Sequence, residues 1–220
     1  MNTGSLLVNV LSLLTTSWGL YNAAEVKLPA SLAQAGHKQF LTNISVGITI
    51  LTNLTSIFTY FTNGKLEVFS REIAFPVALV LETIVALVYW PLRLFALHLI
   101  FHGVADDAHA PLKTSIDLSI HLLPVLYLLA DYFAFTDKPF QMPRRNVWFI
   151  VMALGLLYNR YLKFLIDPSK GQAYPYPFLN IPEPFQSVVF TVVTTSGWGF
   201  YCFYKYVHHE TKRGLKLKQA

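Results

Sequence analysis

The sequence predicts an all-α integral membrane protein, a bundle of six transmembrane helices with both termini in the cytosol. Of the 220 residues, 54% are hydrophobic and only 13% are charged, whereas soluble domains contain about 25% charged residues. In addition, six apolar segments follow one another along the chain, and each is close to the roughly 20 residues that a helix needs to cross a bilayer.

The chain is expected to form one polytopic membrane domain, residues 1–220. The first segment has no basic residue before it and is long for a signal peptide, so we expect a retained helix rather than a cleaved leader. Trp90-Pro91 interrupts the third segment, because proline removes a backbone donor. The stretch from there to residue 102 is either a kinked extension or a helix at the interface. The spans are expected at roughly 4–24, 41–62, 73–92, 114–135, 147–166 and 184–206, before a basic tail, 207–220.

Lysine and arginine residues are divided unevenly between the two sides of such a bundle. Ten lie in the two termini and the second and fourth loops, and four lie in the other loops. Positively charged loops face the cytosol, which places both termini there. The net charge of +5 therefore reflects topology, and we expect no nucleic-acid partner. The final "KLKQA" resembles the K-x-K-x-x retrieval signal of endoplasmic-reticulum membrane proteins; the alternatives are topology charge or contact with anionic lipid.

The fourth segment, "TSIDLSIHLLPVLYLLAD", holds the most informative polar residues. Asp117 and His121 are four positions apart and share a helix face, so the acid can orient the imidazole and hold one tautomer. The ring of Pro124 disturbs the bond to the Ile120 carbonyl, and the resulting kink makes room for a ligand. This pattern predicts a site beside His121.

A second polar feature is "GHKQFLTNISVG", where Thr42 and Asn43 begin the second segment. The second and fourth segments both start on the lumenal side, so Thr42 and His121 lie toward the same membrane face. A threonine hydroxyl attacks a carbonyl only when a base takes its proton, and a neutral imidazole suits that task. The alternative is that Thr42 is simply the N-cap of its helix.

Two rival functions remain open. His98 and His102 form an H-x-x-x-H pair that would supply two zinc ligands from one helix face, so the chain could be a zinc-dependent lipid hydrolase. Further ligands would be Asp106, Asp107, His109 and His121. A lipid-binding scaffold or transporter without chemistry is the other rival, because ionisable groups inside a membrane often couple to protons or ions. Its candidates are Glu82, Asp117 and Asp131.

Four stretches resemble one known family. They are "KQFLTN", "IHLLPVLYLLAD", "YPYPFLNIPEP" and "VVFTVVTTSGWGFYCFY". In order and spacing they are similar to the family of the androgen-induced protein and the androgen-dependent TFPI-regulating protein, the FAR-17a-like membrane threonine hydrolases. The likeness covers nearly the whole chain. Two details depart from the family: Pro124 follows the histidine after a shorter gap, and Asp117 stands where an asparagine is expected.

The resemblance implies a multi-pass hydrolase that cleaves fatty acid esters of hydroxy fatty acids. It maps the threonine nucleophile to Thr42 and the histidine to His121, without metal or other cofactor. Asp117 as the orienting residue and Asn43 as an oxyanion donor are inferences from position alone. We therefore expect an endoplasmic-reticulum lipid-ester hydrolase whose partners are the lipid ester and membrane lipids, and which works through an acyl-enzyme.

Overall fold

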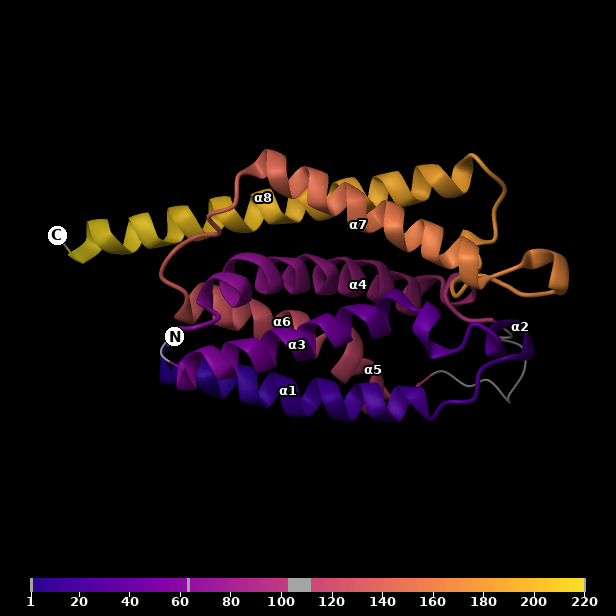
Figure 1. Cartoon of the computed structure of the whole chain (residues 1–220), viewed down its shortest axis with the longest axis horizontal. Coiled ribbons are helices and arrows are strands. Elements are labelled where there is room, and N and C mark those ends of the chain that lie inside the picture. The colour runs from indigo at the N-terminus through magenta and orange to yellow at the C-terminus, as the bar shows by residue number, and fades with distance from the viewer. Residues whose placement is uncertain (1, 63, 103–111, 220) are drawn as a thin grey trace.

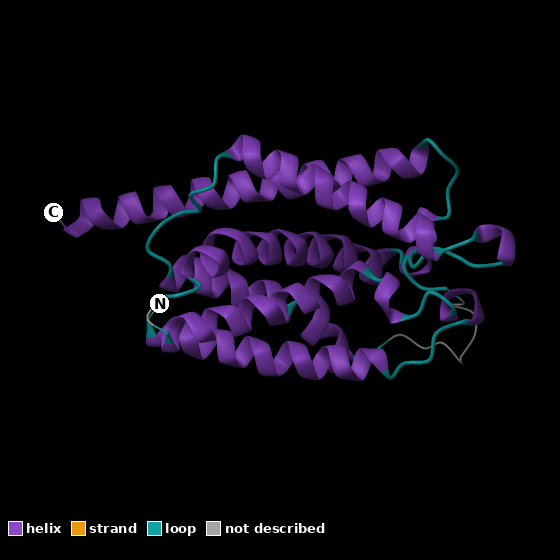
Figure 2. Ribbon diagram, viewed as in Figure 1, coloured by secondary structure: helices purple, strands orange, loops and turns teal. Residues whose placement is uncertain are grey.

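The computed structural model describes residues 2–62, 64–102 and 112–219, with side chains up to Thr211. These residues form helices and connecting loops without a strand (Figure 2), which confirms the all-α prediction for the described part of the chain. The helices are α1 (Thr3–Ala24), α2 (Ala30–Ala33), α3 (Leu41–Phe61), α4 (Phe75–Phe95), α5 (Thr114–His121), α6 (Leu123–Ala130), α7 (Arg144–Leu165) and α8 (Phe185–Gln219).

The helices run back and forth along one axis (Figure 1). α4 packs against α3, α6 and α8, and α7 lies along α8. Both termini lie at one end of the bundle. At the opposite end lie the connections formed by residues 25–40, 96–102 and 166–184, which we call the loop end (Figure 1). α8 continues without a break to Gln219, so the last apolar segment and the basic tail form one helix.

The faces of α1 are inverted relative to those of a soluble protein. Its inward face is polar or small, whereas large apolar side chains point outward. The inward residues are Ser5, Asn9, Ser12, Thr16, Gly19 and Ala23. The outward residues include Leu7, Leu11, Leu14, Trp18 and Tyr21. α3 repeats the arrangement with an inward face rich in threonine and serine. Small and polar residues at helix contacts and apolar residues outside are typical of helices packed in lipid.

Three helical stretches are long and apolar enough to cross a membrane: Leu41–Phe61, Phe69–Phe95 and Arg144–Lys170. The bent pair Thr114–His121 and Leu123–Phe135 adds a fourth if it counts as one span. Among the described residues, α1 and α8 do not reach that hydropathy. For α1 the reason is its polar inward face, which lowers the mean hydropathy of the helix although these polar residues are buried.

Two predicted segments differ from the observed helices. The third begins earlier, with a π-helical turn at Phe69–Ala74, and α4 runs through Pro91 to Phe95 before a short 3-10 turn, Leu97–Leu99. Neither a long extension nor an interface helix is present there. The fourth segment is not one helix: α5 and α6 meet at Leu122 with a bend of 41°. Pro124 in the first turn of α6 lacks the N–H that would continue the ladder.

Candidate active site

A tight turn positions Thr42 at the start of α3. Gly36 has a left-handed backbone (φ 65°), which glycine adopts without steric penalty. A 3-10 turn, His37–Gln39, follows, and the extended Phe40 leads into the helix. The buried Gln39 amide donates to the carbonyls of Leu32 and Gly36, both at 2.9 Å. The entry into α3 is therefore fixed by hydrogen bonds on the loop end.

Thr42 is not the N-cap of α3, so the capping interpretation is wrong. Phe40 occupies the cap position and makes no side-chain capping bond. Thr42 lies in the first turn, where the backbone N–H groups have no partner within the helix. The neighbouring Asn43 side chain donates to the His37 carbonyl at 2.8 Å, so its amide braces the turn.

His121 is the last residue of α5, directly before the bend. Its Nδ1 lies 3.4 Å from a carboxylate oxygen of Asp117 and 3.2 Å from the Asp117 carbonyl. A proton on Nδ1 satisfies these acceptors and leaves the Nε2 lone pair free to act as a base. The Tyr89 ring stacks on the imidazole with 3.5 Å between centroids and 2° between planes. The Trp90 indole donates to the His121 carbonyl at 3.2 Å.

Asp117 connects the histidine to α4. Its carboxylate accepts from the Tyr89 hydroxyl at 2.6 Å and from Arg93 Nε at 3.2 Å. One carboxylate thus meets a phenol, a guanidinium and an imidazole. Such a set fixes the position of each side chain, because moving one leaves a buried polar group unpaired.

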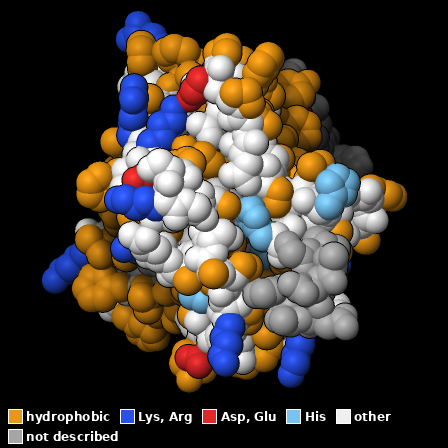
Figure 3. Space-filling model, turned by 90° about the vertical axis from the view of Figure 1, so that its right-hand side faces the viewer, with side chains coloured by type: hydrophobic (Ala, Val, Ile, Leu, Met, Phe, Trp, Pro, Cys, Tyr) orange, Lys and Arg blue, Asp and Glu red, His pale blue; other side chains and the backbone are white. Residues whose placement is uncertain are grey.

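A cavity of about 210 Å³ at the loop end brings the sequence-predicted residues together. Thr42 and Asn43 from α3 and His121 from α5 line it, with Tyr89 and Tyr176. Asp117 is not among the lining residues and lies behind His121. Histidine side chains are also visible near the middle of this end of the molecule (Figure 3).

Tyr176 is a site residue that the sequence reasoning did not single out as functional. It stacks on Phe178 at 5.4 Å and meets the edge of Phe40 at 6.0 Å. Burial raises the pKa of its hydroxyl, and hydrogen bonding with the Thr42 hydroxyl and with the backbone of Thr42 and Leu41 partly offsets this rise. Its place in the "YPYPF" stretch was the available signal, since aromatic residues rarely cluster in a loop unless they pack against something.

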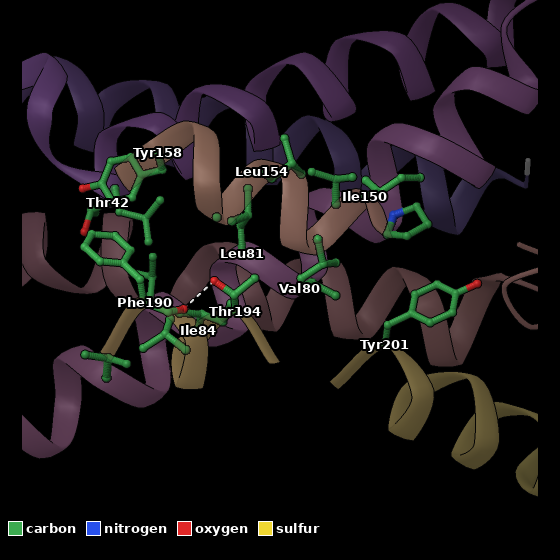
Figure 4. A pocket seen from close by; sticks show the side chains of 18 of the residues that line it. Thr42, Val80, Leu81, Ile84, Ile150, Leu154, Tyr158, Phe190, Thr194 and Tyr201 are labelled. Carbon is green, nitrogen blue, oxygen red and sulfur yellow. Dashed lines mark hydrogen bonds between the residues drawn. The ribbon is translucent and has the colours of Figure 1, made fainter. Parts of the chain in front are cut away.

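A second cavity, of about 190 Å³, begins at the same threonine. It runs as a groove between α4 on one side and α7 with α8 on the other (Figure 4). Thr42 and Tyr158 lie at one end and Tyr201 at the other, with Val80 and Ile150 between them (Figure 4). Thr42, Tyr89, Ile100 and Tyr176 line both cavities. Thr42 therefore lies where a cavity that contains His121 and other polar groups meets an almost wholly apolar one.

The histidine pair predicted for zinc does not share a helix face. His98 lies in the 3-10 turn Leu97–Leu99, and His102 follows it with Nε2 2.8 Å from the Tyr174 carbonyl. The turn breaks the helical spacing that the prediction required. In the described part of the chain, no group of three or more histidine, cysteine, aspartate or glutamate side chains could hold a metal. The predicted ligands Asp106, Asp107 and His109 lie outside the described residues.

Apolar helices whose small and polar side chains face inward define the class as a helical integral membrane protein. The comparisons agree. The model of the FAR-17a/AIG1-like protein family matches residues 4–209, and the chain belongs to this family, which confirms the resemblance seen in the sequence motifs. UPF0641 membrane protein YHR140W of Saccharomyces cerevisiae is 46% identical, covering 96% of this chain and 95% of that protein. UPF0641 membrane protein PJ4664.05 of Schizosaccharomyces pombe is 28% identical, covering 78% and 75%. No solved structure matches.

Proposed function

We propose that this membrane protein is a hydrolase that cleaves lipid esters with Thr42 as nucleophile and His121 as base. One observation carries the proposal: Thr42 and His121, from different helices, line one cavity. Asp117 supports it, because its contact with Nδ1 leaves Nε2 as the basic nitrogen.

The reaction follows from these positions. His121 Nε2 takes the hydroxyl proton while Thr42 Oγ attacks the ester carbonyl carbon. The protonated imidazole then gives that proton to the departing alcohol, and the acyl group stays on Thr42. Water attacks this acyl-enzyme with the same imidazole as base and releases the acid. Asp117 keeps the ring in place and stabilises its charge, with no metal or other cofactor in the sequence of steps.

The oxyanion donors in this proposal are at the start of α3. The first-turn amides of Leu41 and Thr42 have no helical partner, and the positive end of the helix dipole adds to their field. The Tyr176 hydroxyl lies against these same amides, so in the reaction the ester oxygen would take its place beside them. Donors fixed before the reaction stabilise the developing negative charge without reorganisation. The Asn43 side chain uses one of its two N–H groups to brace the turn at the His37 carbonyl.

The membrane setting belongs to the same proposal. All six long helical segments cross the bilayer, both termini face the cytosol and the loop end faces the lumen. The alternating helix directions (Figure 1) and the excess of positive charge near the termini support this topology. The terminal "KLKQA" favours the endoplasmic reticulum. The family resemblance favours fatty acid esters of hydroxy fatty acids as substrates, with membrane lipids as surroundings.

The test compares purified wild type with Thr42→Ala, Thr42→Ser and His121→Ala in lipid-ester hydrolysis. Loss of either partner should lower the rate about a thousandfold or more, and Thr42→Ser should retain a hydroxyl and activity. Thr52→Ala is the matched control, because Thr52 is buried on the same helix and its hydroxyl donates to the Ile48 carbonyl of the preceding turn.

Labelling with a fluorophosphonate probe gives the second readout. Wild type and Thr52→Ala should label, and Thr42→Ala should not. Full hydrolysis by Thr42→Ala or His121→Ala would contradict the mechanism. A wild type that binds lipid esters and neither hydrolyses them nor labels would instead indicate a lipid-binding scaffold or a transporter.

A further inference from the structure

The groove between α4 and the α7–α8 pair is apolar along its middle and ends in the described structure near Tyr201, whose hydroxyl donates to the Met142 carbonyl at 2.8 Å. On α4 its lining runs from Pro76 to Tyr89, which at 1.5 Å per residue is about 20 Å. A bilayer core of about 30 Å holds two leaflets, so one lipid chain occupies about 15 Å. The groove is therefore long enough for a whole lipid chain.

The chemistry at the two ends of the groove differs. Thr42 and Tyr176 place hydroxyl groups at the end near the cavity that His121 lines. The walls beyond them are aliphatic, as Val80, Ile150 and Leu154 illustrate (Figure 4). A molecule with one polar carbonyl and one long hydrocarbon tail matches this order, with the carbonyl at Thr42 and the tail pointing toward Tyr201.

Gly197 of α8 packs against three side chains of the groove wall, about halfway along. A Cβ atom there would lie 3.1 Å from Ile84 Cδ1, 3.2 Å from Val80 Cγ1 and 3.4 Å from Val151 Cγ1. All three of these side chains line the groove, whereas Gly197 itself does not. The contacts are with side-chain ends and not with backbone, so a larger residue at position 197 would push these ends into the groove. Gly199, two positions on, has nothing within 4 Å of such a Cβ.

We propose that the groove holds the acyl chain of the ester and that Gly197, by leaving Ile84, Val80 and Val151 room behind the wall, sets the chain length accepted. This inference rests on the proposed function and adds its specificity determinant. Ile84 and Val80 lie five and nine residues from Tyr89, about 7.5 and 13.5 Å along α4. A short acyl chain ends before it reaches Ile84 and Val80. A long acyl chain has to pass them, and so passes the level of Gly197.

The experiment measures kcat/KM of the purified full-length protein for p-nitrophenyl butyrate and p-nitrophenyl palmitate. Gly197→Leu should lower the palmitate value about tenfold or more, in the range that misfit in an apolar pocket produces, and leave butyrate within about twofold. Gly199→Leu is the matched control, since it makes the same change on the same helix outside the groove. It should leave both values unchanged.

A second variant and a binding assay separate the outcomes. Leu154→Trp narrows the groove from α7 and should repeat the selective loss with palmitate. Retention of a palmityl ether, which cannot be hydrolysed, should fall in Gly197→Leu and not in Gly199→Leu. Two results would overturn the inference. In the first, Gly197→Leu and Leu154→Trp have the same kcat/KM as wild type for both esters. In the second, the folded variants lose kcat/KM equally for palmitate and butyrate. If wild type hydrolyses neither ester, the proposed function fails, and ether binding still decides the groove.

Discussion

In the part of the bundle that the structure describes, two arginine–aspartate pairs with buried carboxylates lie one at each end. Near the termini, Arg71 Nη1 lies 2.7 Å from Asp131, and near the loop end Arg93 Nε lies 3.2 Å from Asp117. Both aspartates are almost fully buried, and both pairs join the α4 region to the α5–α6 region. The two pairs differ in what completes each carboxylate shell.

In the pair near the termini, side chains of α1 supply the remaining hydrogen bonds. Ser5 donates to Asp131 at 2.6 Å and accepts from Arg71 at 2.6 Å, and the Asn9 amide donates to Asp131 at 2.9 Å. Arg71 and Asp131 each lie in a π-helical turn, Phe69–Ala74 and Asp131–Phe135. This cluster uses its hydrogen bonds to tie three helical segments together.

The loop-end pair is completed by groups that could take part in a reaction. Tyr89 and His121 fill the places that Ser5 and Asn9 occupy in the other cluster. His121 turns one nitrogen to Asp117 and lines the cavity that Thr42 also lines. A buried ion pair therefore does not by itself mark a candidate active site. The loop-end pair is a candidate because His121, an ionisable neighbour of its aspartate, faces a cavity.

Within this comparison, the largest expected effect on activity comes from Asp117→Ala. The variant removes the carboxylate that faces Nδ1 of His121 and stabilises the protonated imidazole, so ester hydrolysis should fall about a hundredfold to ten-thousandfold. Folding should suffer less, because the Arg93 side chain is 25% exposed and can reach water. Kinetics and thermal unfolding of the same preparation check both statements. A fully active Asp117→Ala protein would contradict the orienting role.

Asp131→Asn should give the opposite pattern. Removing one charge of a closed pair leaves the Arg71 guanidinium uncompensated, which costs about 3–5 kcal/mol of folding free energy. Activity per folded molecule should remain within about twofold. Thermal unfolding in detergent, with hydrolysis normalised to folded protein, measures this. Loss of activity without loss of stability would show that the two clusters are not separate in role.

Tyr89→Phe sharpens the comparison within the loop-end cluster. It removes the hydroxyl that donates to Asp117 at 2.6 Å and keeps the ring that stacks on His121. One hydrogen bond to a charged group contributes about 1.5–3 kcal/mol, so kcat should fall about tenfold to a hundredfold. Tyr89→Leu, which also removes the stacked ring, should fall further. Equal kcat values for the two variants would mean that stacking does not hold the imidazole.

Ser5→Ala should give the smallest effect. The variant loses two short hydrogen bonds, to Asp131 and from Arg71, but the ion pair and the Asn9 bond remain. We expect a loss of about 1–3 kcal/mol in stability and unchanged hydrolysis. The midpoint of thermal unfolding is the measurement. A drop as large as that of Asp131→Asn would mean that the Ser5 hydrogen bonds, and not the ion pair, supply most of the stability of this cluster.

The helices could be placed from the sequence because hydropathy runs and proline positions are local signals. The bend after His121 followed from Pro124, and the observed break at Leu122 agrees with it. The spans predicted from the sequence, 41–62 and 73–92, leave Arg71 in the loop between them, yet it lies in a helical turn and is paired. Charge alone suggests a loop, and only the approach of Asp131 from another segment makes burial favourable.

The candidate site was predicted in part. The direction of each segment placed Thr42 and His121 at one end, and both line one cavity there. The roles of Tyr89 and Tyr176 as neighbours were beyond the sequence, because they depend on how α4 and the loop 166–184 are rotated and docked. The groove was hidden for a similar reason: a stripe of valine and leucine looks the same whether it faces lipid, another helix or a cavity.

The central claim is that Thr42 carries the acyl group with the help of His121. The most direct measurement is mass spectrometry of peptides after brief incubation with p-nitrophenyl palmitate. A palmitoyl adduct should be found on the peptide that contains Thr42 in wild type and Thr52→Ala, and be absent from Thr42→Ala and His121→Ala. An adduct on another residue, or undiminished hydrolysis by Thr42→Ala, would contradict the account.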